Sequence, residues 1–170
     1  MSMVGLWDEL HPQMAGPLGV EATYEAAAKW LDGYGLVEDR GCGLAYARRF
    51  FKRSAYRGVD GSGDSAEVKA DLATYRNAVP CILLRHVVEH NVEWRRVLAN
   101  AVADFERRMA LVVFTPLGHE TSIYRWDGLI PYLTLSEREL LAYLQPWLRH
   151  TFQYPAPGGE FEHLFLLEKP

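Results

Sequence analysis

The chain has 170 residues, of which 49% are hydrophobic and 12% aromatic, and its formal net charge at pH 7 is −4. This length and composition predict one folded domain, residues 1–170, and exclude a disordered chain. The weak negative charge gives no general attraction to nucleic acid or to an anionic membrane, so neither is expected as a partner. Because the sequence lacks an apolar run of roughly 20 residues, a basic-then-apolar leader and a cysteine framework, it predicts a reduced, cytoplasmic protein.

The first predicted elements are an irregular arm and a helix. Residues 1–20 mix apolar side chains with prolines and glycines, which indicates an irregular arm or a short helix. The alanine-rich segment Glu21–Leu31 has high helix propensity, and Asp32-Gly33 marks its end. Residues 1–31 therefore form an N-terminal arm and helix ahead of the first predicted strand.

A strand, a glycine turn and a helix come next. A strand with a short apolar start at Leu36 and Val37 runs into acidic Asp39, and Gly41 and Gly43 follow before the helix-forming stretch 44–52. Glycines let the backbone turn tightly and approach a ligand closely, and the first helical turn offers unpaired N–H groups. This pattern predicts a binding site for a small polar molecule.

Two further strands also end on acids. Tyr56–Asp60 reads as a strand, and 68–70 reads as a brief one that is followed by Asp71. A parallel crossover that contains a helix takes a dozen or more residues, so the intervening Gly61–Glu67 predicts only a loop or a single turn.

The second half of the chain continues the alternation. Cys81–Leu84 reads as a strand buried on both faces, Asn91 as the cap of a long helix whose apolar spacing continues to Met109, and Ala110–Phe114 as another buried strand. The stretch 117–133 predicts a long irregular connection, which is often functional.

The last elements are a helix and a hairpin. Ser136 and Glu139 form a capping-box pair at the head of a helix over Glu137–Leu144, and Thr151–Tyr154 and Glu162–Leu167 read as an antiparallel hairpin. The whole pattern predicts an α/β protein with a Rossmann-like, mainly parallel twisted sheet, helices on both faces and a closing antiparallel hairpin at the C-terminus.

Polar residues gather at the carboxyl ends of the predicted strands, where ligands of such sheets bind. They are Asp39, Asp60, Asp71, Arg85, His86 and Thr115.

A dinucleotide site is one interpretation of these residues. It needs G-x-G-x-x-G and an acid about 20 residues later. Gly41 and Gly43 supply two glycines and Asp60 fits the acid, but Tyr46 stands at the third glycine position. The second acidic strand end, at Asp71, favours a different ligand.

Four stretches in this order resemble the class I S-adenosylmethionine-dependent methyltransferases, and the resemblance covers roughly Tyr24 to Leu167. They are DRGCGLA at Asp39–Ala45, GVDGS at Gly58–Ser62, ADL at Ala70–Leu72 and CILLRHVVEH at Cys81–His90. The chain departs from the family pattern in three ways. Ala45 replaces the last glycine of the first motif, Val79-Pro80 replaces the acid that often opens the fourth strand, and the second helix is much reduced.

The resemblance implies S-adenosylmethionine as cofactor and assigns each motif a part of it. The glycine turn, with Asp39, Gly41, Cys42 and Gly43, would hold the methionine end. Asp60, followed by Gly61, would accept hydrogen bonds from the ribose hydroxyls. The residues that would recognise adenine are Asp71 and Leu72, and Arg85 would also contact the cofactor.

The resemblance also implies methyl transfer to an oxygen or nitrogen of a small-molecule acceptor. His86 follows the fourth strand, where the methyl group would sit, and is the predicted general base, with Glu89 and His90 as alternatives. The N-terminal helix and the 117–133 connection would form a lid, whose aromatic side chains suit a partly apolar acceptor. They are Trp7, Tyr24, Tyr124, Trp126 and Tyr132. The sequence shows no metal-ligand spacing and no nucleophile turn, so no metal is expected.

Two other classes of function stay open. A catalytically inactive binding or regulatory subunit with the same fold is favoured by Ala45 and the short second crossover. A dinucleotide-binding oxidoreductase is the other, against which Tyr46 and Asp71 argue.

Overall fold

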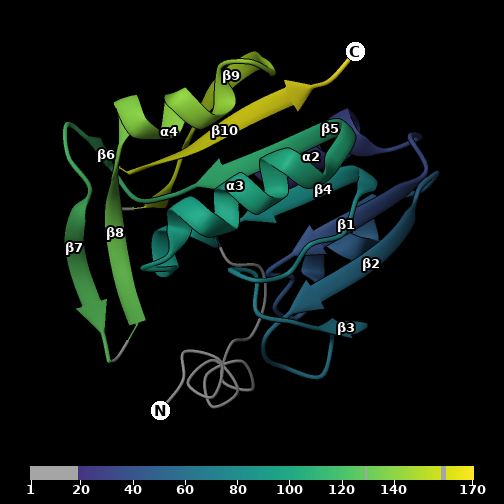
Figure 1. Ribbon diagram of the computed structural model, residues 1–170, viewed down its shortest axis with the longest axis horizontal. Helices are drawn as coiled ribbons and strands as arrows, with labels where there is room; N and C mark the ends of the chain where they lie inside the picture. The colour runs from purple at the N-terminus through teal and green to yellow at the C-terminus, as the bar shows by residue number, and fades with distance from the viewer. Residues whose placement is uncertain (1–18, 129, 158–159) are drawn as a thin grey trace.

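A twisted seven-stranded sheet lies at the centre of the protein, with its strands in the order β3-β2-β1-β4-β5-β10-β9 (Figure 1). The structure is a computed structural model that describes residues 19–128, 130–157 and 160–170. Strands β1 to β5 run parallel, and β10 pairs antiparallel with both β5 and β9. The predicted mainly parallel, Rossmann-like sheet with a closing hairpin is therefore confirmed. The strands are β1 (Leu36–Arg40), β2 (Ala55–Asp60), β3 (Val68–Lys69), β4 (Val79–Arg85), β5 (Phe105–Val113), β9 (Leu148–Pro155) and β10 (Phe161–Glu168).

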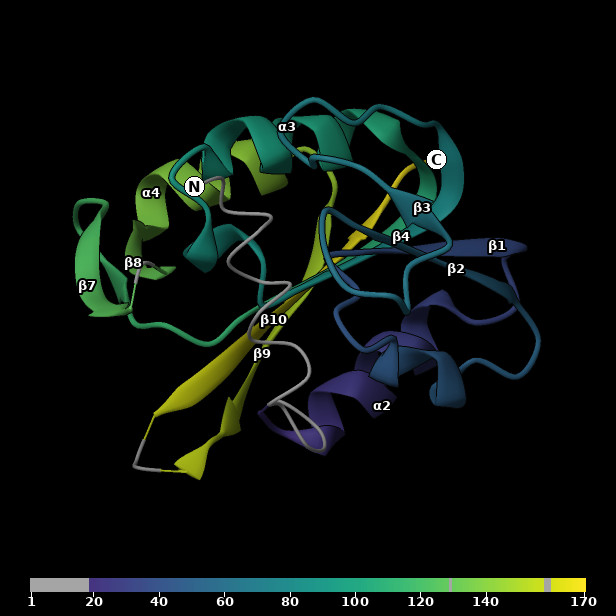
Figure 2. The same cartoon turned by 90° about the horizontal axis from the view of Figure 1, so that it is seen from below.

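Helices cover both faces of this sheet (Figure 2). Helix α2 (Glu21–Leu31) packs on one face, and α3 (Trp94–Asp104) and α4 (Glu137–Leu144) pack on the other. Successive side chains of β4 point to opposite faces, so Cys81 joins the core under α2 and Ile82 joins the core under α3. Because both faces of β4 are buried in this way, the strand reads as a continuous apolar run.

Two predicted helices are shorter in the structure than the sequence indicates. The expected helix over 44–52 is a 3₁₀ helix, η2, at Tyr46–Phe50, because Gly43 and Ala45 are left-handed and delay its start. The expected helix up to Met109 ends at Asp104, where β5 begins. Pairing of β5 with both β4 and β10 outweighs the helical spacing of the apolar residues there.

The 117–133 connection is not irregular, as the sequence predicts, but forms a second sheet. Its three strands, in the order β6-β8-β7, are β6 (Leu117–Gly118), β7 (Ser122–Asp127) and β8 (Ile130–Ser136). Figure 1 shows β7 and β8 as a hairpin beside the main sheet. The antiparallel pairing of β7 with β8 provides hydrogen-bond partners for the backbone N–H and C=O groups of this segment. The sequence pattern did not indicate this pairing.

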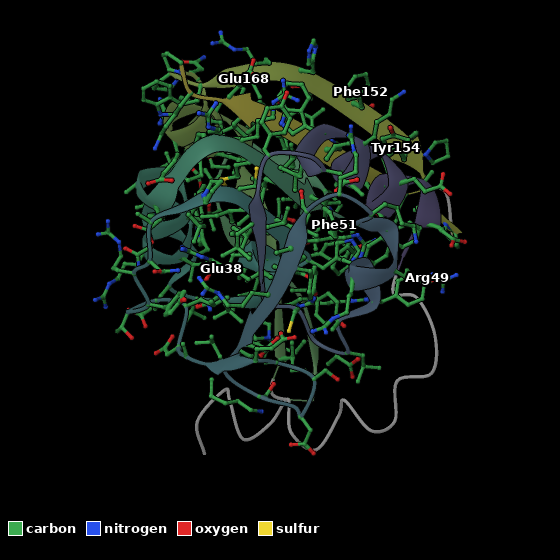
Figure 3. All side chains as sticks on the ribbon, turned by 90° about the vertical axis from the view of Figure 1, so that its right-hand side faces the viewer. Glu38, Arg49, Phe51, Phe152, Tyr154 and Glu168 are labelled. Atoms are coloured by element: carbon green, nitrogen blue, oxygen red, sulfur yellow. The ribbon has the colours of Figure 1, made fainter. Side chains whose placement is uncertain are left out.

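Other local predictions are confirmed. No helix separates β2 from β3 in the described Gly61–Glu67 segment, and the Ser136 side chain accepts a hydrogen bond from the Glu139 N–H at the head of α4. Figure 3 shows Phe152 and Tyr154 along β9, the outer strand of the sheet. The N-terminal arm lies outside the described residues, apart from its last two positions. None of the described helices has the length and apolarity needed to cross a bilayer.

Candidate functional site

One cavity of about 610 Å³ opens at the carboxyl ends of the parallel strands. Nine of the ten site residues predicted from the sequence line it, and they come from separate segments of the chain. These nine are Gly41, Cys42, Gly43, Asp60, Gly61, Asp71, Leu72, Arg85 and His86. The tenth, Asp39, does not line the cavity.

The glycine turn is held against the end of β2. The N–H groups of Gly41 and Cys42 both donate to the carbonyl oxygen of Val59, at 2.7 and 3.3 Å. Gly41 has a φ of +80°, and a Cβ atom there would lie 2.2 Å from Cγ2 of Val87. Both the backbone conformation and the space therefore require glycine at this position. Burial raises the pKa of the Cys42 thiol, so this cysteine is a small wall residue and not a thiolate.

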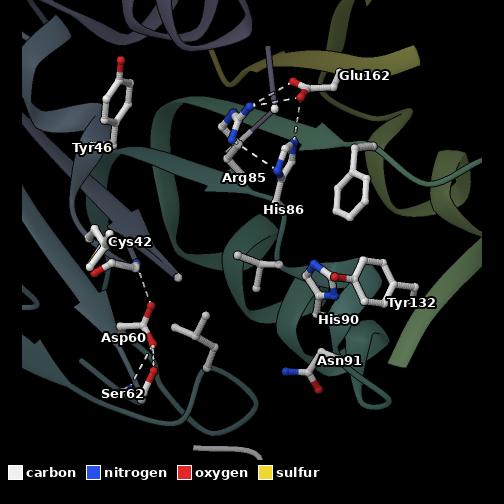
Figure 4. Close-up of a pocket in the computed structure, with 18 of the residues that line it drawn as sticks. Cys42, Tyr46, Asp60, Ser62, Arg85, His86, His90, Asn91, Tyr132 and Glu162 are labelled. Carbon is white, nitrogen blue, oxygen red and sulfur yellow. Dashed lines mark hydrogen bonds and ion pairs between the residues drawn. The ribbon is translucent and has the colours of Figure 1, made fainter. Parts of the chain in front are cut away.

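Asp60 ties the turn to the loop after β2 (Figure 4). Its Oδ2 accepts a hydrogen bond from the Gly43 N–H at 2.9 Å, and its Oδ1 accepts one from the Ser62 N–H at 3.0 Å. The Ser62 hydroxyl also donates to Oδ1 at 3.2 Å, so at least three of the roughly four acceptor positions of this carboxylate are in use.

Asp71 and Leu72 form the wall beyond β3. The Asp71 Oδ1 accepts a hydrogen bond from the Ala73 N–H at 2.9 Å, as in a helix cap. Asn100 of α3 donates its side-chain N–H groups to the carbonyl oxygens of Leu72 and Ala73, at 3.3 and 3.0 Å. This segment is therefore fixed to α3 although it contains no regular helix.

Asp39 lies behind the turn instead of in the cavity. Asp39 belongs to β1, and its Oδ2 accepts a hydrogen bond of 2.5 Å from the hydroxyl of Tyr56 on the neighbouring strand β2. Burial raises the pKa of Asp39 to about 7, although the Tyr56 hydrogen bond opposes the shift. In this structure Asp39 supports the strand that carries the glycine turn and makes no contact with the cavity.

A buried ion pair closes the opposite wall. Arg85, at the end of β4, lies with Nη2 3.0 and 3.2 Å from the two carboxylate oxygens of Glu162, which is the second residue of β10. The Val20 N–H donates to Oε1 of Glu162 at 2.7 Å, and the Thr23 hydroxyl lies 2.6 Å from Oε2. The Arg85 guanidinium also lies over the Tyr24 ring, with Cζ 3.7 Å from its centroid. The start of α2 is thereby fixed to the ends of β4 and β10.

Both charged groups of this pair are buried and ionised. Burial opposes ionisation of Glu162, but the hydrogen bond from His86 and the charge of Arg85 lower its pKa to about 2. Gly19 lies directly against the pair, since a Cβ there would meet Oε1 of Glu162 at 1.9 Å. Sequence reasoning missed Glu162, for which the signal was an acid at the head of the predicted strand 162–167.

His86 has both ring nitrogens directed at this pair (Figure 4). Its Nδ1 lies 3.2 Å from Nη1 of Arg85, and its Nε2 lies 3.3 Å from Oε1 of Glu162. A guanidinium only donates, so Nδ1 is the acceptor and Nε2 carries the proton. Burial lowers the pKa of His86 to about 4, so the ring is neutral at pH 7.

His90 presents the opposite tautomer to the cavity. Its Nδ1 lies 3.1 Å from the carbonyl oxygen of Pro131, and a carbonyl only accepts, so Nδ1 carries the proton and Nε2 has the lone pair. Burial lowers the pKa of His90 to about 4. The neighbouring Glu89 does not line the cavity, and its Oε1 accepts a hydrogen bond from the Phe114 N–H.

The expected lid aromatics occupy different places. Tyr24 and Tyr132 line the cavity, the Tyr124 hydroxyl donates to Glu160 at its rim, and Trp126 is exposed on β7. Trp7 lies outside the described residues. Over the described part of the chain, no group of three or more histidine, cysteine or acidic side chains is arranged to hold a metal ion.

Comparison of the sequence finds no matching protein-family model and no matching curated protein. Solved structures with a similar fold do exist. One is the magnesium protoporphyrin IX methyltransferase from Synechocystis PCC 6803 with bound S-adenosylmethionine, at 16% identity over 99% of this chain and 92% of that chain, with a TM-score of 0.68. Another is the mitomycin 7-O-methyltransferase MmcR, at 18% identity over 88% of this chain and 53% of that chain, with a TM-score of 0.58.

The fold of this chain is that of the class I S-adenosylmethionine-dependent methyltransferases. The fold alone does not define the reaction. A third similar structure, with 12% identity over 88% of this chain and 80% of that chain and a TM-score of 0.65, is named a [4+2]-cyclase, SpnF. The reaction must therefore be argued from the site.

Proposed function

We propose that this protein is an S-adenosylmethionine-dependent methyltransferase that acts on an oxygen or nitrogen of a small-molecule acceptor. The observation that carries the proposal is the convergence of three recognition elements on one cavity. The glycine turn after β1, the acid that ends β2 and the acid–leucine pair after β3 line the same space, although they come from separate segments. A cavity of about 610 Å³ lies within the range of small-molecule sites.

The residues fit the proposed cofactor. The backbone at Gly41–Gly43, which lines the cavity, would hold its methionine end. Asp60 would accept hydrogen bonds from the ribose hydroxyls, and Asp71 would accept one from the adenine amine, with Leu72 against the ring. The cofactor, when bound, supplies a methyl group on a positively charged sulfur. The solved structure of the Synechocystis methyltransferase with S-adenosylmethionine bound supports this choice of ligand.

The protein's part in the transfer is alignment and removal of a proton. A hydroxyl acceptor that took the methyl group would have to release its proton, and a base of this chain would receive it. We assign this role to His90, which lines the cavity and whose tautomer, with the proton on Nδ1, places the basic lone pair on Nε2. The lone pair of His86 is on Nδ1 and faces the Arg85 guanidinium instead. His86 is then a positioning residue that holds the wall in place.

Titration calorimetry with three ligands tests the cofactor. S-adenosylmethionine and its demethylated product should bind to the purified protein, and NAD should not. Binding of NAD without S-adenosylmethionine would support the oxidoreductase alternative and overturn the proposal. Binding of S-adenosylmethionine without turnover of any acceptor would instead favour an inactive regulatory subunit.

Asp60→Ala gives the residue-level test. Hydrogen bonds to charged groups contribute roughly 1.5–3 kcal/mol, so loss of the carboxylate should weaken cofactor binding at least about tenfold. Asp64→Ala is the matched control, because Asp64 belongs to the same loop but does not line the cavity. Equal affinity in the two variants, both folded by circular dichroism, would remove Asp60 from the site.

A further inference from the structure

Part of the cavity wall is made of aromatic and histidine rings. The His86 and Phe114 rings have centroids 4.6 Å apart, His90 and Tyr132 are 4.5 Å apart in an edge-to-face arrangement, and Phe114 and Tyr132 are 5.8 Å apart. All four residues line the cavity, and Figure 4 shows His90 beside Tyr132 below the Arg85–Glu162 pair. Such a wall favours a flat, ring-containing ligand, because rings stack offset or edge to face on one another.

The guanidinium of Arg125 stacks on one ring of this wall. Arg125 of β7 is directly opposite Tyr132 of β8 in the strand pairing, and its guanidinium carbon lies 4.2 Å from the centroid of the Tyr132 ring. Arg125 also lines the cavity. A guanidinium that stacks on a ring keeps the N–H groups at its edge available for hydrogen bonds.

The charge of Arg125 is not neutralised within the described part of the chain. No carboxylate there lies within ion-pair distance of Arg125, and no described acceptor forms a hydrogen bond with its guanidinium. Three other charged groups of the cavity wall do have partners. Arg85 is paired with Glu162, Glu93 with Arg96, and the exposed Glu160 accepts a hydrogen bond from the Tyr124 hydroxyl.

Resting on the proposed function, we propose that the methyl acceptor is a planar ring compound that carries a carboxylate. Its ring lies against Phe114 and Tyr132, and its carboxylate forms a two-point ion pair with Arg125. A guanidinium matches the planar geometry of a carboxylate with two parallel hydrogen bonds, which gives both charge recognition and orientation. The acceptor is then held by its acid at the rim, with its ring directed toward His90.

Three probe ligands separate the ring from the charge. They are 2-naphthoate, its neutral amide 2-naphthamide, and butyrate, which has the acid without the ring. Each is titrated into the full-length protein saturated with the demethylated cofactor, and binding is followed by ligand-observed NMR. We expect 2-naphthoate to bind at least about tenfold more tightly than either of the other two, as loss of one charge-assisted contact predicts.

Substitution of the arginine tests its part directly. Arg125→Gln should abolish the preference for 2-naphthoate over its amide and leave the affinity for the demethylated cofactor unchanged. Arg125→Lys keeps the charge without the two-point geometry and should retain part of the preference. Arg107→Gln is the matched control, because Arg107 is an exposed arginine on β5 that does not line the cavity.

The outcomes distinguish this proposal from the proposed function. Equal binding of acid and amide by the unmodified protein, or no binding of 2-naphthoate at all, overturns the acceptor class even if the cofactor binds. A preference that survives Arg125→Gln also overturns it. If 2-naphthoate binds through Arg125 but the demethylated cofactor does not bind, the anion site stands and the methyltransferase proposal fails. Should the Arg125 variants not fold, the comparison of the three probes still decides.

Discussion

Loss of the buried pair of Arg85 and Glu162 should strongly destabilise the fold. The exposed fractions of the two side chains are 4% and 1%, so neither charge is solvated by water. The Glu162 carboxylate also receives the Val20 N–H and lies 2.6 Å from the Thr23 hydroxyl, and it thereby fixes the start of α2. Glu162→Gln removes the negative charge while the amide oxygen still accepts from one of these donors.

The magnitude follows from what the substitution leaves behind. Breaking a buried ion pair by removing one partner costs about 3–5 kcal/mol, because the remaining charge is buried without compensation. The introduced glutamine keeps part of the hydrogen bonding, so the lower end of this range, about 3 kcal/mol of unfolding free energy, is expected. Replacing both partners by apolar residues, Arg85→Met with Glu162→Leu, should cost less than the sum of the two single replacements, since no orphan charge remains.

Urea unfolding at pH 7, followed by circular dichroism, measures these free energies. Glu93→Gln is the matched control, because Glu93 pairs with Arg96 on the surface and should cost at most about 1 kcal/mol. The pKa of Glu162 is lowered to about 2, so the stabilisation from its charge is complete above the unfolded value of 4.5 and is lost as the pH falls toward 2. The deficit of Glu162→Gln should therefore shrink below about pH 4.5. A cost at pH 7 as small as that of the surface control would refute the reasoning.

Two other predictions concern buried titratable groups. Burial raises the pKa of Asp39 to about 7, so its contribution to stability falls as the pH rises from about 4 to 7. The unfolding free energy of Asp39→Asn, relative to that of the unmodified protein, should therefore increase by about 2–3 kcal/mol from pH 5 to pH 8. Urea unfolding measures this difference, and a difference that does not change with pH would contradict the burial argument. His90→Gln should lower turnover of a hydroxyl acceptor about 10²–10⁴-fold at unchanged cofactor affinity, whereas His86→Gln should act mainly on stability. Because burial lowers both histidine pKa values to about 4, turnover should stay level from pH 8 to pH 6, and a fall centred near pH 6.5 would contradict the assignment.

Features that depend on neighbours in the sequence were predicted correctly. The glycine turn at Gly41–Gly43, the acids Asp60 and Asp71 at strand ends, and the Ser136 cap each follow from residue types within a few positions. The order of strands and helices is also local information, because apolar periodicity and glycines mark where each element begins and ends. The sequence alone therefore determined the fold class and nine of the residues that line the cavity.

What the tertiary structure decided involves residues far apart in the chain. Glu162 meets Val20 across 142 positions, so nothing near either residue indicates the contact. Pairing of β5 with β4 and β10 turned the expected end of the α3 helix into a strand, because ladder hydrogen bonds and burial on both faces outweigh local helical spacing. The Asp39 carboxylate is hydrogen-bonded to Tyr56 on the neighbouring strand and does not line the cavity. The tautomer of His86 depends on the Arg85–Glu162 pair, and that of His90 depends on the Pro131 carbonyl. The direction of each side chain and the partner of each ring nitrogen are set only when the strands assemble into the sheet. The chemistry of the site depends on these directions and partners.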